Sequence, residues 1–225
     1  FLSIMDPPRL GVKEAVRQCK KGGIRVIMIT GDHPATARTI AREMEIFTKV
    51  DLAVEGKDIK HLSEEEFHKV KVFARVAPSD KEIIVERYQA QDRICAMTGD
   101  GINDSPALKA ANCGIAMGIT GTDLAKETSD MVISDDNFTS IKEGVKIGRG
   151  LFAKIRTIIY FFICLNIMEA VIFFSYEFVP GFLLFKSEWQ HIYIFGVVHS
   201  LPSLALVIDA HPKKVMEEPP RDEEE

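Results

Sequence analysis

The sequence predicts an α/β protein with a parallel sheet, followed by an α-helical transmembrane hairpin. Short apolar segments alternate with helical patterns over residues 1–140, and this alternation is typical of a parallel sheet with right-handed crossovers. Most of residues 151–210 is instead apolar and aromatic, although the apolar fraction of the whole chain is an ordinary 46%. We therefore expect one α/β domain over 1–140, a stalk with two transmembrane helices over 141–212, and an acidic cytoplasmic tail over 213–225.

The elements of the α/β part are predicted from short apolar runs and from helix start signals. The predicted strands are Ile24–Thr30, Ile94–Thr98, Gly114–Met117 and Met131–Ser134. The predicted helices are Arg9–Lys20, Pro34–Glu45, a short surface helix after Ser63 in an otherwise polar 51–72 region, Asp80–Ala90 with Ser79 as its N-cap, and Ser105–Ala111.

Composition makes two classes of function improbable on physical grounds. The formal net charge is -5 and no long basic run occurs, so we expect no nucleic-acid partner. The four cysteines include no CxxC pair. We therefore expect reduced thiols rather than a disulfide framework or a zinc site.

Two acids follow the predicted strand that ends at Thr98. Asp100 and Asp104 lie four residues apart, and glycines beside them let the backbone turn closely. Hard oxygen ligands at a strand end suit Mg²⁺, which binds one or two carboxylates plus substrate phosphate. Asn103 is a candidate donor to a phosphate oxygen. A helix N-cap with nearby acids would look the same, and a lone Gly-Asp turn favours that alternative.

Further polar groups shift the interpretation towards phosphate chemistry. Two strand ends carry the same tripeptide, Thr30-Gly31-Asp32 and Thr98-Gly99-Asp100, and ligands of parallel sheets bind at that edge. Thr30 offers a hydroxyl there, and the helix N-terminus that follows attracts anions. Lys81 lies early in its helix, where a cation can neutralise a transferring phosphoryl group. An isolated lysine of this kind is more often a solvated surface residue.

The segments TGDGIND, APSDK, the first TGD and MDPPR resemble the hydrolase-domain motifs of P-type cation-transporting ATPases. These ATPases belong to the haloacid dehalogenase-like superfamily, and the resemblance runs from about residue 3 to residue 220. It implies a Rossmann-like, haloacid dehalogenase-like sheet in residues 1–140, which would be the C-terminal part of a phosphorylation domain. It also implies Mg²⁺ and ATP as cofactors.

The resemblance implies a role for each matching residue. Asp100 would bind Mg²⁺, and Asn103 and Asp104 would order the phosphate site. Lys81, Thr30 and Gly31 would contact the phosphoryl group. The side of the site that faces the nucleotide, and the hinge, would be organised by Asp6, Arg9, Asp32 and Arg75.

The family's nucleophile is the aspartate of an Asp-Lys-Thr-Gly-Thr motif, and the sequence lacks that motif. The resemblance therefore implies one part of a pump that couples aspartyl-phosphate formation and hydrolysis to cation transport. Its partners would be the nucleotide-binding, actuator and other membrane segments. Without the nucleophile we expect the chain alone to be inactive, and the start at Phe1 leads us to expect a fragment. The alternative is a membrane-anchored, hydrolase-like module with a non-catalytic binding or regulatory role.

Two apolar segments are long enough to cross a bilayer, Thr157–Tyr176 and Gln190–Ile208. Lysines and arginines precede the first and follow the second, which places both ends of the hairpin in the cytoplasm. We expect a multi-pass membrane protein with residues 1–150 and the C-terminal tail cytoplasmic. Two buried helices of a large soluble protein are the alternative, but 225 residues leave little chain to cover them.

Asn166 and Glu169 lie three residues apart within the first segment, so they share one helix face. Polar groups at mid-span usually mark a pathway or a partner. A glutamate that snorkels to the headgroups or is protonated is the alternative. The segment resembles the fifth membrane helix of type II, calcium-pump-like ATPases, where the matching residues help to bind the transported cation. Calcium is therefore the favoured cation.

The second membrane segment departs from the family pattern. Phe195, Val198 and His199 stand where the calcium and sodium/potassium branch carries Asn, Thr and Asp. An imidazole removes a negative charge and a hard ligand from an oxygen-rich calcium site. His199 would either alter the selectivity, with a proton-linked site as one form, or donate to a neighbouring backbone carbonyl.

Overall fold

The computed structural model describes residues 11–179, 188–208 and 215–220. The predictions for Asp6 and Arg9 therefore lie outside the described residues. The chain divides into two compact units, one formed by Phe1–Gly144 with Met216–Glu225 and the other by Val145–Val215. Each unit is described by itself.

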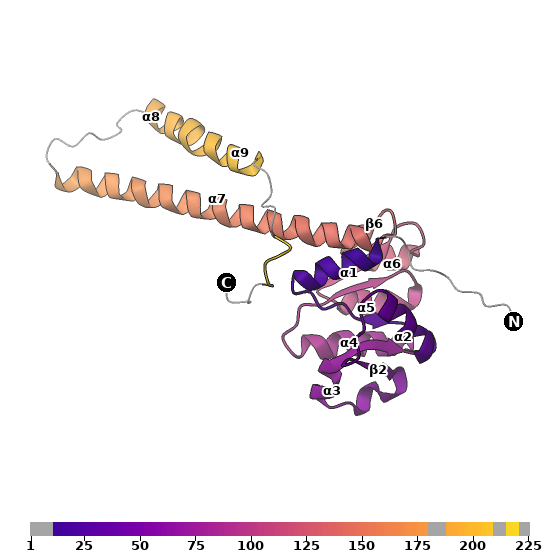
Figure 1. Ribbon diagram of the computed structural model, residues 1–225. Helices are drawn as coiled ribbons and strands as arrows, with labels where there is room; N and C mark the ends of the chain where they lie inside the picture. The colour runs from indigo at the N-terminus through magenta and orange to yellow at the C-terminus, as the bar shows by residue number, and fades with distance from the viewer. Residues whose placement is uncertain (1–10, 180–187, 209–214, 221–225) are drawn as a thin grey trace. The chain divides into compact units, whose positions relative to one another are not determined.

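The first unit contains two three-stranded sheets, and every strand pair in them is parallel (Figure 1). The first sheet has the order β1-β3-β2, with β1 at Met28–Ile29, β3 at Val70–Ala74 and β2 at Leu52–Glu55. The second has the order β4-β5-β6, with β4 at Ala96–Gly99, β5 at Cys113–Met117 and β6 at Met131–Ile133. The predicted α/β class with a parallel sheet is confirmed.

Helices alternate with these strands along the chain. They are α1 (Val12–Lys21), α2 (Pro34–Glu43), the 3₁₀ helix η1 (Gly56–His61), α3 (Glu64–Lys69), α4 (Pro78–Gln89), the 3₁₀ helix η2 (Ile102–Asp104), α5 (Ser105–Ala110) and α6 (Asp123–Thr128). Helix α2 packs on β3 and β2, whereas α5 and α6 pack on β5. Ser63 caps α3 with a reciprocal bond to Glu66, so the predicted start of that helix is confirmed.

The structure corrects two predicted boundaries and adds two strands that the sequence did not predict. Helix α4 begins at Pro78 rather than after Ser79, because proline suits a first helical turn and the Asp80 carboxylate accepts from the Ala77 amide at 3.2 Å. Strands β2 and β3 lie in the region predicted as polar with one surface helix. The strand predicted from Ile24 is confined to Met28–Ile29, because β1 pairs only with two residues of β3.

Phe67 is one of two fully buried phenylalanines in the first sheet's core. Its ring lies 4.6 Å from the Tyr88 ring and 5.6 Å from the Phe73 ring, centroid to centroid, and the Arg87 guanidinium stacks 4.4 Å from its centroid. Ile29 of β1 and Cys95 before β4 contact this cluster and also the core cluster of the second sheet. These two residues therefore join the cores of the two sheets.

We expect Phe67→Ala to lower the free energy of unfolding by about 3–5 kcal/mol, because it removes a fully buried aromatic ring. Val50→Ala is the control, since Val50 is 83% exposed and surface substitutions usually stay within about 0.5 kcal/mol. Chemical denaturation of both variants measures the difference. A loss below about 1 kcal/mol for Phe67→Ala would contradict the described packing.

Helix α7 (Phe138–Phe178) begins in the first unit and continues into the second as one uninterrupted helix (Figure 1). The second unit also contains α8 (Glu188–Tyr193), a π-helical turn η3 (Ile194–His199) and α9 (Ser200–Ile208). Glu169 contacts His199, and the Lys154 amine donates to the Val207 carbonyl at 2.9 Å. These contacts make the run from α8 to α9 antiparallel to α7, which is the predicted hairpin.

Within the described ranges, one helix is long and apolar enough to cross a membrane, Phe138–Ser175. It contains nearly all of the first predicted span. The second predicted span coincides with the shorter segments α8, η3 and α9, of which Ile194–Ile208 is an apolar helix below spanning length. The π-helical turn divides this run because it changes the hydrogen-bond register locally.

Candidate functional site

Asp104 of η2 anchors a cluster at the carboxyl end of β4. One of its carboxylate oxygens lies 2.5 Å from the Lys81 amine of α4. The other accepts from the backbone amides of Asp100 at 3.3 Å and Gly101 at 3.2 Å. The Asp104 side chain is 9% exposed and that of Lys81 is 20% exposed. The structure therefore brings together three residues predicted from the sequence, Lys81, Asp100 and Asp104.

Gly99 lets the end of β4 approach η2. A Cβ atom at this position would lie 2.5 Å from the Asp104 Cβ and 2.9 Å from its carboxyl carbon. Any side chain here would push η2 away from the strand. The first glycine of the TGDGIND segment is thus needed for close approach.

Asp100 differs from Asp104 in the exposure of its side chain. Its side chain is exposed, and within the part of the chain that the structure describes nothing bonds to its carboxylate, while its backbone carbonyl accepts from the Thr122 amide at 2.8 Å. The described residues contain no group of three or more His, Cys, Asp or Glu side chains that suits a metal. A single carboxylate of this kind still fits Mg²⁺, which keeps several waters and takes other oxygens from phosphate. Asn103 lies exposed beside it in η2.

A second group of predicted residues lies at the ends of β1 and β3. The Thr30 hydroxyl donates to the Asp32 carboxylate at 3.0 Å and accepts from the Asp32 amide at 3.1 Å. The Arg75 amide donates to the Asp32 carbonyl at 3.0 Å. Gly31 is exposed, and a Cβ there would meet nothing within 4 Å. The turn after β1 is therefore anchored on β3 while Gly31 faces open space.

Arg75 has a φ of 48°, in the left-handed region that residues other than glycine rarely adopt. Its neighbour Val76 donates its amide to the Thr30 carbonyl at 3.1 Å, and the chain then enters α4, which carries Lys81. The connection from β3 to α4 thus bonds to Thr30 and leads into the helix that carries Lys81. Both residues lie on the carboxyl side of the parallel strands. Strained backbone of this kind is concentrated at functional sites.

Asp136, which follows β6, was not predicted from the sequence as a site residue. Its side chain is buried, and its carboxylate accepts from the Ile119 amide at 2.9 Å, the Thr120 amide at 2.8 Å and the Thr120 hydroxyl at 2.8 Å. Burial raises the pKa of Asp136, but these hydrogen bonds outweigh burial and hold the pKa at about 2. The available signal was the pair of acids directly after a predicted strand.

The low pKa of Asp136 predicts an acid-sensitive contribution to stability. A folded pKa of about 2 lies below the unfolded value of about 3.9, so the contribution is complete above about pH 4 and is lost as the pH falls towards 2. As the pH is lowered from 5 to 2, we expect the midpoint temperature of unfolding to fall less steeply for Asp136→Asn than for the unsubstituted protein. Thermal unfolding across that range measures it, and parallel curves would contradict the prediction.

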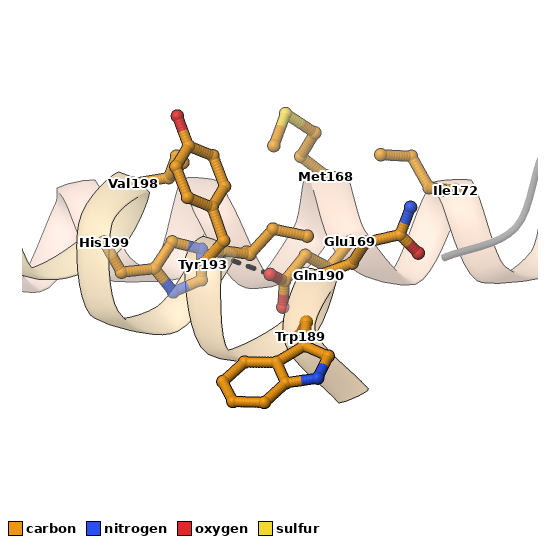
Figure 2. A pocket seen from close by; sticks show the side chains of 9 residues that line it. Met168, Glu169, Ile172, Trp189, Gln190, Tyr193, Val198 and His199 are labelled. Atoms are coloured by element: carbon orange, nitrogen blue, oxygen red, sulfur yellow. Dashed lines mark ion pairs between the residues drawn. The ribbon is translucent and has the colours of Figure 1, made fainter. Parts of the chain in front are cut away.

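The predicted cation residues lie in the second unit, where a cavity of about 470 Å³ opens beside Glu169 and His199 (Figure 2). The His199 side chain is 7% exposed, and its Nε2 atom lies 3.1 Å from the Glu169 carboxylate. Phe195 packs edge-on against the imidazole, with ring centroids 5.1 Å apart. The contact is an ion pair when the imidazole is protonated. The other lining residues are Met168, Ile172, Trp189, Gln190, Tyr193, Ile194 and Val198.

Asn166 is not a lining residue of this cavity. Its amide donates to the Phe162 carbonyl of its own helix at 2.7 Å. The structure thus brings Glu169 together with His199 rather than with Asn166. Of the two alternatives stated for His199, neither is decided by its contact with the Glu169 carboxylate.

Two models of haloacid dehalogenase-like hydrolases match the chain, one over residues 1–112 and one over residues 81–144. Together the two matches assign residues 1–144 to the haloacid dehalogenase-like hydrolase family.

The chain is also similar to cation-transporting ATPases, as its motifs predicted. It is 41% identical over 222 residues to a calcium-transporting ATPase of Bacillus subtilis, covering 97% of this chain and 25% of that protein. It is 39% identical over 251 residues to the human potassium-transporting ATPase alpha chain 2, covering 98% and 24%. It is 40% identical over 233 residues to the P-type sodium-transporting ATPase4 of Toxoplasma gondii, covering 96% and 17%. The chain spans a quarter or less of the length of these relatives.

Proposed function

We propose that this chain is part of an ATP-driven cation pump that forms and hydrolyses an aspartyl-phosphate, with calcium as the favoured cation. The observation that carries the proposal is the cluster at the end of β4, where Lys81 and Asp104 pair beside the exposed carboxylate of Asp100. The similarity to a bacterial calcium-transporting ATPase supports the choice of cation.

Each site residue then has a role on this chain. Asp100 holds Mg²⁺, which supplies positive charge to the transferring phosphate when it is bound. Lys81 neutralises a further phosphoryl oxygen, and Asp104 fixes the position of that lysine. Thr30 and Gly31 offer a hydroxyl and open space just after β1.

The remaining predicted residues serve binding rather than phosphoryl transfer. Asn103 orders the phosphate, and the ATP side and the hinge are organised by Asp6, Arg9, Asp32 and Arg75. Asn166 and Glu169 bind the transported cation. In this proposal residues 1–140 are the C-terminal part of a phosphorylation domain, 141–212 form a stalk with two membrane helices, and 213–225 are a cytoplasmic tail. Residues 1–150 are cytoplasmic as well, and the protein is multi-pass.

The phosphorylated aspartate is proposed to lie outside this chain. Asp104 is a poor nucleophile because both of its oxygens are held, one by Lys81 and one by two amides. Within the described residues, β1 pairs only with β3 and β4 only with β5. Both strands therefore have an edge on which strands from the rest of the pump can pair.

Phosphorylation by labelled ATP tests the proposal. The full-length protein that contains this chain is expected to incorporate acid-stable phosphate in a Mg²⁺-dependent and cation-dependent manner, whereas the isolated chain incorporates none. Acid-stable labelling of the isolated chain would overturn the assignment of the nucleophile. A full-length protein that is never labelled would favour a non-catalytic binding or regulatory module.

The cation site is tested by Glu169→Gln in the reconstituted full-length protein. Because a carboxylate is the hard, charged ligand that calcium requires, we expect about a tenfold or larger rise in the calcium concentration for half-maximal activation. Ser175→Ala, six residues further along α7, is the control. Unchanged calcium affinity in His199→Ala would remove His199 from the site, and unchanged affinity in Glu169→Gln would exclude the site itself.

A further inference from the structure

We propose that Asp136 is a positioning residue for Asp100, which it holds in place through the loop that follows β5. The inference rests on the proposed function, because it concerns the carboxylate assigned to Mg²⁺. Asp136 follows β6 and Asp100 follows β4. The loop over residues 118–122, which lies between β5 and α6, makes hydrogen bonds to both residues. We call this loop the β5 loop.

Asp136 fixes the first half of the β5 loop. Its carboxylate accepts from the amides of Ile119 and Thr120 and from the Thr120 hydroxyl, at 2.8–2.9 Å. The Gly118 amide donates to the Ile133 carbonyl of β6 at 2.8 Å. Three consecutive residues of the loop are therefore tied to the end of β6.

The second half of the loop contacts Asp100. The Thr122 amide donates to the Asp100 carbonyl at 2.8 Å. Between the two halves stands Gly121, which is buried, and a Cβ there would lie 1.9 Å from the Met117 carbonyl oxygen. The loop is packed too tightly at this point to absorb a shift, so a displacement at Thr120 is passed to Thr122 and from there to Asp100.

The turn after β6 does not need a buried carboxylate for its own geometry. The neighbouring Asp135 is exposed and accepts from the Asn137 amide at 3.2 Å and from the Ser140 hydroxyl at 2.7 Å. Asp136 instead adopts a φ of 49° and buries its charge, and both are unfavourable unless other groups compensate. The described bonds of its carboxylate all go to Ile119 and Thr120 of the β5 loop, so this carboxylate orders that loop.

The test uses the full-length protein with Mn²⁺ as a paramagnetic substitute for Mg²⁺. Electron paramagnetic resonance follows Mn²⁺ binding and its displacement by Mg²⁺, independently of turnover. We expect Asp136→Asn to raise the Mg²⁺ concentration for half-displacement by at least fivefold, with a matching rise in the Mg²⁺ required for phosphorylation. Asp135→Asn is the matched control, since it removes the same charge from the adjacent position, and its Mg²⁺ requirement is expected to stay within twofold.

A second pair of variants tests the link from the loop to Asp100 directly. Thr122 has a φ of -69°, which proline adopts without strain. Thr122→Pro removes the amide hydrogen that bonds to the Asp100 carbonyl, whereas Thr122→Ala loses only the hydroxyl that caps α6. We expect Mg²⁺ to bind at least fivefold more weakly to the proline variant than to the alanine variant.

The outcomes separate the inference from the proposed function. If the unsubstituted protein binds no Mn²⁺ and forms no phosphoenzyme, the proposed function fails. If it does both, the inference depends on the variants. If Asp136→Asn binds Mg²⁺ as tightly as Asp135→Asn, or Thr122→Pro as tightly as Thr122→Ala, Asp136 has only a structural role and the inference is overturned. If Asp136→Asn does not fold, the comparison of Thr122→Pro with Thr122→Ala decides.

Discussion

Asp104→Ala is expected to lower the free energy of unfolding by about 3–5 kcal/mol, the usual cost of removing one partner from a buried charge pair. The substitution leaves the Lys81 amine, whose side chain is only 20% exposed, without its carboxylate. It also leaves the amides of Asp100 and Gly101 without the acceptor that shapes the turn. The same variant of the full-length protein is expected to form phosphoenzyme at a rate reduced by about 10²-fold or more, because Asp100 and Lys81 both lose their positions.

Chemical denaturation and rapid phosphorylation measure these two effects of Asp104→Ala. Glu65→Ala is the control, because Glu65 is an exposed acid on α3. A variant as stable as the control would show that the contacts of Asp104 do not order the turn. A stable variant that is phosphorylated at the normal rate would exclude Asp104 from the site.

Lys81→Met is expected to reduce the rate of phosphoenzyme formation by about 10²–10³-fold, the effect of removing one preorganised charge from a transition state. Methionine keeps the length and the apolar part of the side chain but not the ammonium group. Lys109→Met on α5 is the control, since that lysine is exposed. Phosphorylation at saturating ATP measures the rate, and a loss of less than about fivefold would contradict the role of Lys81.

Combining the substitutions distinguishes a structural pair from a catalytic one. If Lys81 and Asp104 act together, the loss of stability in the double variant Lys81→Met, Asp104→Ala is expected to fall short of the sum by about 0.5–3 kcal/mol. The loss of phosphorylation rate in the double variant is expected to be close to that of either single variant. Additive losses would mean that Lys81 and Asp104 contribute independently to stability and to the phosphorylation rate, despite their 2.5 Å contact.

The sequence predicted the second sheet better than the first. Strands β4, β5 and β6 are short apolar runs bounded by Gly, Asp or Ser, and such runs are recognised from pattern alone. Strand β3 escaped prediction because Lys71 interrupts its apolar residues and a polar helix precedes it directly. In the structure the side chains of Val70, Val72 and Phe73 are fully buried, so tertiary packing decided the outcome.

The site was predictable where a motif is local and was missed where it depends on packing. Asp100, Asn103 and Asp104 share one short segment, and Lys81 lies at a helix start, so the sequence could indicate each of them. The role of Asp136 depends on hydrogen bonds to a loop 16 or 17 residues away. Likewise, periodicity placed Asn166 beside Glu169 on one helix face, but only the fold of the hairpin brings Glu169 to His199.

The central claim is that this chain holds Mg²⁺ and the phosphoryl group at the rim of its parallel strands, while the acceptor carboxylate belongs to another part of the protein. Mass-spectrometric mapping of the phosphorylated residue in the full-length protein tests this claim most directly. We expect the phosphate on a single aspartate outside residues 1–225, and no phosphate when Asp100 is replaced by asparagine. Phosphate on any residue of this chain, or labelling that is unaffected by Asp100→Asn, would contradict it.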